Sequence, residues 1–190
     1  EKVSEEQIDK FMNRANKHIE YMSETIDDFR NFYKPSKSKN EFSIKECIDT
    51  LLYMVKNQFE DEGIKINFEC EDIKILNYEN ELKQALLNIL NNAKDALLSK
   101  KQKEYFEAII YIKTSIQDNK LLIEVLNNGD LIDENIIDRI FEPYFTTKFE
   151  DQGTGIGLYM TKSIVETNMK GKIEVSNISN GVKFTICLSI

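Results

Sequence analysis

The 190-residue sequence is poor in the features that mark several specialised protein classes. Its three cysteines, Cys47, Cys70 and Cys187, are odd in number, lie far apart and include no C-x-x-C pair, which argues against a disulfide framework and a zinc site. We expect all three to be buried free thiols in a reducing compartment. No run of about 18 apolar residues is present, so no membrane-spanning helix is predicted. These absences indicate a soluble, cytoplasmic protein.

Positive charge is also scarce. The chain has 25 Lys and Arg residues against 33 Asp and Glu residues, and its formal net charge is −8. A nucleic-acid-binding protein would present a basic face, so we expect no nucleic-acid partner. Hydrophobic residues make up 41% of the chain, enough for one domain of ordinary size with a helical appendage. The chain begins at Glu1 with neither a methionine nor a signal peptide, which predicts a piece of a longer protein.

Glycine and proline are few, but three of the seven glycines and one of the two prolines fall in residues 140–162, IFEPYFTTKFEDQGTGIGLYMTK. The glycines alternate with two other residues, in the order Gly153, Thr154, Gly155, Ile156 and Gly157. Such a backbone can approach a ligand closely. A helix predicted over 158–169 would follow, and the unpaired N–H groups of its first turn suit phosphate. A plain flexible turn is the alternative for this motif taken alone.

Residues 1–35 predict one long helix that ends at Pro35. Apolar residues recur at alternating spacings of four and three from Ile8 to Tyr33, which is a heptad seam. The seam must be buried against another helix, and no helix of matching pattern occurs elsewhere, which favours a partner outside this chain. The alternative is packing against its own domain.

Residues 36–190 predict a second domain that mixes helices with mostly antiparallel strands. Helices are expected from Ser43, with Glu46 completing a capping box, to about Phe59, from an Asn80 cap to about Leu98, and over 133–140 and 158–169. Strands are expected over 64–70, 73–78, 108–116, 121–126, 172–175 and 182–188. Further expectations are a charged loop over 100–104, hairpin turns at Asp118-Asn119 and Asn180-Gly181, and helix ends at Gly63 and Gly171. The pattern predicts an α+β fold with a layer of helices on one sheet.

The helix expected from Asn80 carries a polar stripe. Gln84, Asn88, Asn92 and Asp95 are spaced by four, four and three residues, so they share one face, opposite an apolar face. Asparagine is unfavourable inside helices, which indicates a functional reason for it. An amide oxygen here is suited to a hard cation such as Mg²⁺, which prefers oxygen ligands and accompanies nucleotide phosphates. A solvated helix face is the alternative.

Four segments in order, NILNNAKDAL, NNGDLI, IFEPYFTTK and GTGIGLYMTK, followed by a terminal G-x-x-F-x-I strand, resemble the N, G1, F and G2 boxes of bacterial two-component sensor histidine kinases. MSETIDDFRNFYKP is similar to the second helix of their dimerisation hairpin. The resemblance covers about residues 22–190 and implies a two-layer α/β sandwich of Bergerat ATPase type, preceded by a long N-terminal helix. It implies ATP and Mg²⁺ as cofactors, a response-regulator receiver domain as partner and a homodimer in the intact protein. No membrane contact by this piece is expected, although the whole protein could be a membrane-anchored sensor with this part in the cytoplasm.

The resemblance also implies the residues of a nucleotide site. Asn92 would be the magnesium ligand, Asn88 would lie beside it as a catalytic residue, and Lys148 would lie in a lid near the phosphates. The other expected nucleotide contacts are Asp95, Asn127, Gly129, Phe145, Thr147, Gly153, Thr154, Gly155, Ile156, Gly157 and Leu158.

Two features depart from the family pattern. The G1 box usually opens with an aspartate that accepts a hydrogen bond from the adenine amino group, whereas this chain has Asn127. We expect altered or weaker adenine recognition, and the alternative is that Asn127 merely ends a strand before a turn. The family's phosphoacceptor histidine lies in the first hairpin helix, which is missing here. We expect His18, the only histidine, to be a solvated helix residue rather than the acceptor.

The sequence therefore predicts the ATP-binding catalytic portion of a sensor histidine kinase. It would position the γ-phosphoryl group of Mg-ATP for transfer to a histidine upstream of Glu1, and then to a response-regulator aspartate, and this piece should not autophosphorylate. Catalysis would rest on positioning and charge neutralisation. The alternatives are a nucleotide-binding regulatory module without kinase activity, a chaperone-type or mismatch-repair-type ATPase, and a coiled-coil interaction protein. The motif FEPYFTTK fits the second poorly, and the glycine loop argues against the third.

Overall fold

The computed structural model describes residues 38–147 and 155–190 of the chain. The helix expected over residues 1–35, and with it His18, lies outside the described residues. Five strands form the main sheet: β2 (Ile64–Glu69), β4 (Ala108–Gln117), β5 (Lys120–Asn127), β6 (Lys172–Ile178) and β7 (Gly181–Ser189). Their order across the sheet is β2, β4, β5, β7, β6; β2 and β4 are parallel, and the other neighbours are antiparallel.

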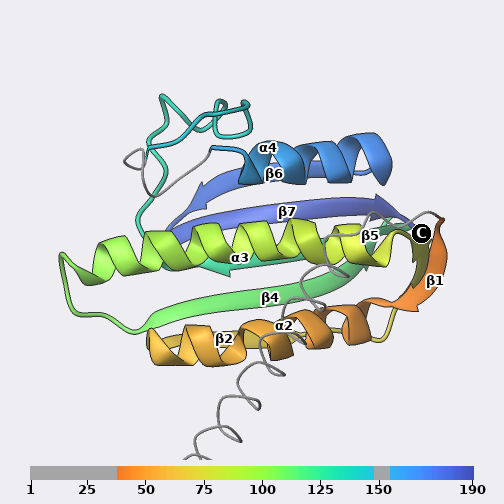
Figure 1. Ribbon diagram of the computed structural model, residues 1–190, viewed down its shortest axis with the longest axis horizontal. Helices are drawn as coiled ribbons and strands as arrows, with labels where there is room; N and C mark the ends of the chain where they lie inside the picture. Colours follow the sequence, from red (N-terminus) through yellow and green to blue (C-terminus); the bar gives the residue numbers. More distant parts are fainter. Residues whose placement is uncertain (1–37, 148–154) are drawn as a thin grey trace, which may run out of the picture. The chain divides into compact units, whose positions relative to one another are not determined.

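The helices pack on one side of this sheet, as expected for the two-layer sandwich. They are α2 (Ile44–Asp61), α3 (Glu79–Lys101), α4 (Gly157–Lys162) and a π-helical continuation, η1 (Ser163–Asn168). In Figure 1 α3 runs along the middle of the sheet, with α2 and α4 on either side of it. The side chains that fill the space between the layers are at most 2% exposed and include Leu82, Leu86, Ile89, Ile110, Ile112, Leu121, Ile123 and Val125.

A separate two-stranded sheet joins β1 (Asn40–Ser43) to β3 (Lys74–Asn77), and β1 was not expected from the sequence. Ser43 ends β1 and also caps α2, because its Oγ accepts a hydrogen bond from the backbone N–H of Glu46 at 3.1 Å. The predicted cap is confirmed, and α2 continues two residues beyond the expected Phe59.

The expected Asn80 cap of α3 is wrong. The helix begins at Glu79, two residues earlier than an Asn80 cap implies, and the N-cap residue Tyr78 makes no side-chain capping bond. Asn77, the last residue of β3, instead accepts a hydrogen bond from the Tyr78 N–H through Oδ1 at 3.0 Å. Two acidic side chains in the first turn also suit the positive end of the helix dipole.

The C-terminal end of α3 differs from the prediction as well. Lys100 and Lys101 are helical, although they were expected in a charged loop. Both are bonded rather than simply solvated. Lys101 Nζ donates to the carbonyls of Glu62 and Gly63 at 2.6 and 2.9 Å, and Lys100 Nζ donates to the carbonyl of Asn128 at 3.0 Å.

The helix expected over 133–140 is also wrong. This segment forms successive turns, in which the N–H groups of Ile136, Arg139 and Glu142 each donate to the carbonyl three residues earlier. Its apolar residues Ile136 and Ile140 line a pocket instead of forming the buried stripe of a helix. These two isoleucines therefore belong to a pocket wall rather than to a helix face.

Both hairpins form, although the second turns at Ser179-Asn180, one residue before the predicted Asn180-Gly181, because Gly181 already pairs with Ile178 as the first residue of β7. Asp118 and Asn119 have φ values of 49° and 58°, as a tight turn between β4 and β5 requires. The chain also leaves the helical segment near Gly171, whose N–H donates to the carbonyl of Val165 at 2.8 Å. The residue with positive φ is Lys170, however, and Gly171 is needed because a Cβ there would lie 2.6 Å from the Leu188 side chain.

The three cysteines are free, but only Cys47 is buried, and Cys70 and Cys187 are partly exposed, contrary to expectation. Burial raises the pKa of the Cys47 thiol to about 12. Among the described helices, none combines the length and apolar character that crossing a membrane requires.

Candidate functional site

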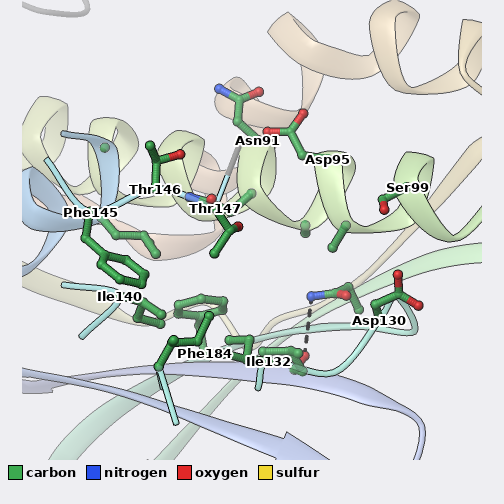
Figure 2. A pocket seen from close by; sticks show the side chains of 18 of the residues that line it. Asn91, Asp95, Ser99, Asp130, Ile132, Ile140, Phe145, Thr146, Thr147 and Phe184 are labelled. Carbon is green, nitrogen blue, oxygen red and sulfur yellow. Dashed lines mark hydrogen bonds between the residues drawn. The ribbon is translucent and has the colours of Figure 1, made fainter. Parts of the chain in front are cut away.

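A pocket of about 870 Å³ opens between α3, the loop after β5, the 133–147 segment and the start of α4. Its volume lies within the range typical of small-molecule sites. In Figure 2 the apolar side chains of Ile140, Phe145 and Phe184 gather at one end, and Ser99 and Asp130 lie at the other. The pocket therefore joins an apolar surface to a polar one.

Nine of the expected site residues line this pocket: Asn88, Asn92, Asp95, Asn127, Phe145, Thr147, Gly155, Gly157 and Leu158. Gly129 and Ile156 are not among the lining residues. Lys148, Gly153 and Thr154 lie outside the described residues. The α3 stripe, the end of β5 and the start of α4 thus meet in space, although they are far apart in the sequence.

Asn88 joins α3 to the first turn of α4. Its Nδ2 donates to the carbonyl of Gly157 at 3.1 Å and to Oγ1 of Thr161 at 3.3 Å. The fully buried Thr161 hydroxyl itself donates to the same carbonyl at 2.9 Å. Because a carbonyl only accepts, the NH₂ end of the Asn88 amide must face it, and the amide oxygen is left to face the pocket.

Asn92, one turn further along α3, is oriented in the same way. Its Nδ2 donates to the backbone carbonyl of Asn88 at 3.0 Å, so Oδ1 is again the end that remains for a ligand. Two amide oxygens on adjacent turns suit a hard cation. Among the described residues there is no group of three or more His, Cys, Asp and Glu side chains that could hold a metal by themselves. A cation here would therefore depend on these amides together with oxygens of a bound ligand.

Asn127 ends β5 with its side chain 4% exposed. Its Oδ1 accepts a hydrogen bond from the Gly129 N–H at 3.0 Å, and its Nδ2 lies 3.5 Å from the carbonyl of Val182. A Cβ on Gly129 would lie 3.0 Å from the Cβ of Ala96 on α3, so glycine lets this loop approach the helix. The turn role considered for Asn127 is real, and the side chain also lines the pocket.

The apolar lining was largely missed by the sequence reasoning. It includes Leu131, Ile132, Ile136, Ile140, Val182 and Phe184, in addition to the expected Phe145 and Leu158. Phe184 is held edge-on against Phe141, with ring centroids 6.4 Å apart. The G-x-x-F-x-I pattern of the last strand was the available signal for Phe184. Ile136 and Ile140 had been assigned to a helix that does not form.

The charges of the described pocket lining oppose the binding of an anionic ligand. Three carboxylates line the pocket, those of Asp95, Asp130 and Asp133, and none of the described lining residues is Lys or Arg. Lys103 does not line the pocket, but it partly neutralises the negative charge of Asp130, because its Nζ lies 2.6 Å from Asp130 Oδ2. A polyanion bound here therefore needs positive charge from a metal ion or from parts of the chain outside the described lining.

Gly155 is required by the backbone. It has a φ of 64°, and a Cβ on it would collide with the backbone of Tyr144, which itself has a φ of 64°. A positive φ is unusual for a bulky residue, and such conformations concentrate at functional sites. The two chain segments on either side of residues 148–154 are thus in close backbone contact beside the pocket.

Comparison with known proteins agrees with this geometry. The family described as "Histidine kinase-, DNA gyrase B-, and HSP90-like ATPase" matches residues 77–190. The two-component sensor PprA of Pseudomonas aeruginosa is 30% identical over 162 residues, covering 78% of this chain and 18% of that protein. The histidine-protein kinase AtoS of Escherichia coli is 30% identical over 179 residues, covering 92% of this chain and 28% of that protein. The chain thus spans less than a third of either relative.

Solved structures give the same result. The catalytic domain of the histidine kinase ThkA superposes with a TM-score of 0.69 at 29% identity, covering 80% of this chain and 95% of that domain. ThkA in complex with the response regulator TrrA has a TM-score of 0.65 over 98% of this chain and 52% of that one; at 23% identity this match supports the fold alone. The chain therefore belongs to the histidine kinase-, DNA gyrase B- and HSP90-like ATPase family, as an ATPase domain of the sensor histidine kinase type.

Proposed function

We propose that this chain is the ATP-binding catalytic portion of a sensor histidine kinase. It would position the γ-phosphoryl group of Mg-ATP for transfer to a histidine upstream of Glu1, and then to an aspartate of a response regulator. The observation that carries the proposal is the orientation of Asn88 and Asn92, whose amide nitrogens are hydrogen-bonded to backbone carbonyls while both residues line the pocket. Their oxygens are thereby available to a metal-bound nucleotide.

The proposed chemistry is positioning and charge neutralisation. Bound Mg²⁺ would supply positive charge at the phosphates, and the amide oxygen of Asn92 would hold it, with Asn88 beside it. Lys148 would supply a second positive charge, which the carboxylate-lined pocket makes necessary. Gly153, Thr154, Gly155, Ile156, Gly157 and Leu158 would bring backbone N–H groups to the phosphates, and Asp95, Gly129, Phe145 and Thr147 would contact the nucleotide. No nucleophile is needed in this part of the chain.

The proposed partners follow from the relatives. ThkA, whose catalytic domain is 29% identical to this chain, is described in complex with the response regulator TrrA, and by analogy we propose a receiver domain as the partner of the whole protein here. A homodimer of the intact protein rests on the heptad seam of residues 8–33. We place the activity in the cytoplasm, where ATP and response regulators are found.

The decisive experiment is calorimetry of ATP binding with and without Mg²⁺. We expect binding that depends on Mg²⁺, and we expect Asn92→Ala to remove most of that dependence, because one coordination position is left to water. Gln84→Ala is the matched control, since Gln84 lies on the same stripe of α3 but does not line the pocket. Equal metal dependence in Asn92→Ala and the unmodified chain would contradict the assignment of Asn92.

A nucleotide-binding regulatory module without kinase activity is the second candidate. One observation favours it. The family pattern has an aspartate where this chain has Asn127, and the Asn127 side-chain oxygen already accepts a hydrogen bond from the Gly129 N–H. The two candidates separate when the chain is extended to include the upstream helix. A kinase labels its histidine with γ-labelled ATP, whereas a regulatory module binds ATP and leaves the histidine unlabelled.

A further inference from the structure

Lys100 is held at the last turn of α3 by three groups. Its Nζ donates to the backbone carbonyl of Asn128 at 3.0 Å, lies 4.7 Å from the centroid of the Phe106 ring and lies 3.7 Å from the Glu104 carboxylate. The side chain is only 16% exposed. A partly desolvated ammonium bonds to a carbonyl more strongly than an exposed one does, so this contact is expected to be firm.

Asn128, whose carbonyl accepts this hydrogen bond, lies in the loop after β5. Asn128 Oδ1 accepts from the Ile109 N–H at 2.8 Å, and Asn128 Nδ2 donates to the Glu107 carbonyl at 2.8 Å. The Asn128 N–H also donates to the Ile109 carbonyl at 3.3 Å. Asn128 is thus fixed to the start of β4 on one side and, through Lys100, to the end of α3 on the other.

This loop forms one wall of the pocket. Asn127 and Asp130 line the pocket on either side of Asn128, and Gly129 lies against Ala96 of α3. Figure 2 shows Asp130 on this loop and Ser99 on α3 at the same end of the pocket. A movement of Asn128 relative to α3 would therefore displace two lining residues together.

We infer that Lys100 is a positioning residue for nucleotide binding, acting by holding the 127–130 loop at the correct distance from α3. The inference rests on the proposed function, since it takes the pocket to bind a nucleotide. Lys100 itself does not line the pocket, so its effect passes through Asn128. Lys103 adds a second, more exposed tie to the same loop through Asp130.

The adjacent lysine offers a matched control. Lys101 occupies the same turn of α3 and also donates to backbone carbonyls, those of Glu62 and Gly63, at 2.6 and 2.9 Å. These carbonyls belong to the turn between α2 and β2, and none of these residues lines the pocket. Removing either ammonium should destabilise the fold, but only Lys100 should affect the nucleotide.

The test compares Lys100→Met, Lys100→Arg and Lys101→Met by calorimetry with Mg-ATP and by hydrogen exchange without nucleotide. Methionine keeps the apolar stem against Phe106 and removes the charge. We expect Lys100→Met to bind Mg-ATP roughly tenfold more weakly, equivalent to about 1.4 kcal/mol. We also expect faster exchange of the 127–130 amides. Lys100→Arg should recover most of the affinity, and Lys101→Met should lower Tm while leaving Kd unchanged.

The ratio of ATP affinities with and without Mg²⁺ should stay constant in Lys100→Met, because Asn88 and Asn92 are untouched. Unchanged Kd in Lys100→Met would overturn the inference, and so would an equal loss of affinity in Lys101→Met, which would indicate general destabilisation. Failure of the unmodified chain to bind Mg-ATP is a separate outcome, which would overturn the proposed function itself.

Discussion

At the scale of single residues, the pocket depends on the direction in which each asparagine amide is turned. A neighbouring backbone carbonyl attracts the NH₂ end, as Gly157 does for Asn88, and a neighbouring N–H attracts the oxygen, as Gly129 does for Asn127. The same residue type therefore presents an acceptor to the pocket from α3 and has its acceptor occupied at the end of β5. Asparagine serves both needs because it carries a donor and an acceptor on one short side chain.

The first residue-scale prediction concerns Asn127→Asp. Aspartate can still accept from the Gly129 N–H, but its second oxygen would replace an NH₂ that lies 3.5 Å from the Val182 carbonyl. Two acceptors repel, so the free protein should lose Tm. The carboxylate should accept a hydrogen bond from the amino group of adenine, which an ionised acceptor strengthens. We therefore expect ATP affinity to rise by about fivefold relative to the unmodified chain, or roughly 1 kcal/mol. GTP, which carries a carbonyl at that position, should bind more weakly.

Competition of ATP and GTP against a fluorescent nucleotide measures this effect. Asn67→Asp, an exposed change on β2, controls for the added negative charge and should leave the ATP to GTP ratio unchanged. If Asn127→Asp and Asn127→Ala both leave that ratio as it is in the unmodified chain, Asn127 ends β5 without reading the base.

At the scale of elements, the sequence predicted several features that local chemistry decides, although it misplaced the cap of α3. Ser43 caps α2 as predicted, and Asp118-Asn119 turns the hairpin as predicted, because both outcomes depend on residues a few positions apart. The parallel pairing of β2 with β4 joins segments more than 40 residues apart and leaves no local signal. The turns over 133–140 were mistaken for a helix because a pocket wall spaced its apolar residues much as a helix would.

The candidate site also has features that local spacing predicted and features that depend on residues far apart in the sequence. The spacing of Asn88, Asn92 and Asp95 predicted a common face of α3, and all three do line the pocket. The orientation of Asn88, however, depends on a carbonyl 69 residues away, which no spacing rule reaches. The glycine motif was found from the spacing of its glycines, the family resemblance supplied Asn127, and most of the apolar wall was recognised only in the folded structure.

An element-scale prediction comes from the packing of α2 on α3. Cys47 is fully buried, and its thiol lies against the Glu79 carbonyl at 4.0 Å. Burial raises its pKa from 9.0 to about 12, so the folded protein holds the thiol proton while the unfolded chain releases it above about pH 9. Stability should therefore fall as pH rises from 9 towards 12. By pH 10 the loss should be on the order of 1 kcal/mol.

Urea unfolding at several pH values between 8 and 10, under reducing conditions, isolates this contribution when the chain is compared with Cys47→Ala. The variant should be less stable at pH 8, because a buried group is lost, yet its stability should decline less steeply with pH. Parallel declines in the two proteins would mean that the Cys47 thiol does not set the alkaline limit.

At the scale of the whole molecule, the described domain holds a pocket that we propose binds a nucleotide, and the chain matches only 18% and 28% of the lengths of PprA and AtoS. Phosphoryl transfer requires the acceptor within about 3 to 3.5 Å of the γ-phosphorus in an in-line arrangement. Under the proposed function, another part of the protein delivers the acceptor to the pocket. His18 is the only histidine in this chain, and therefore its only candidate for the phosphoryl acceptor.

We predict that the chain binds ATP and does not autophosphorylate on His18. The position of His18 beside the seam residues Ala15 and Ile19, in the segment that resembles the second hairpin helix, differs from that of the family's acceptor. Incubation with γ-labelled ATP should give no acid-labile label, while a binding assay on the same sample shows that ATP is bound. We also predict weak self-association through the heptad seam, seen as a sedimentation coefficient that rises with concentration. Acid-labile label that disappears in His18→Ala would place the acceptor within this chain, and the transfer step would then have to be reassigned to His18.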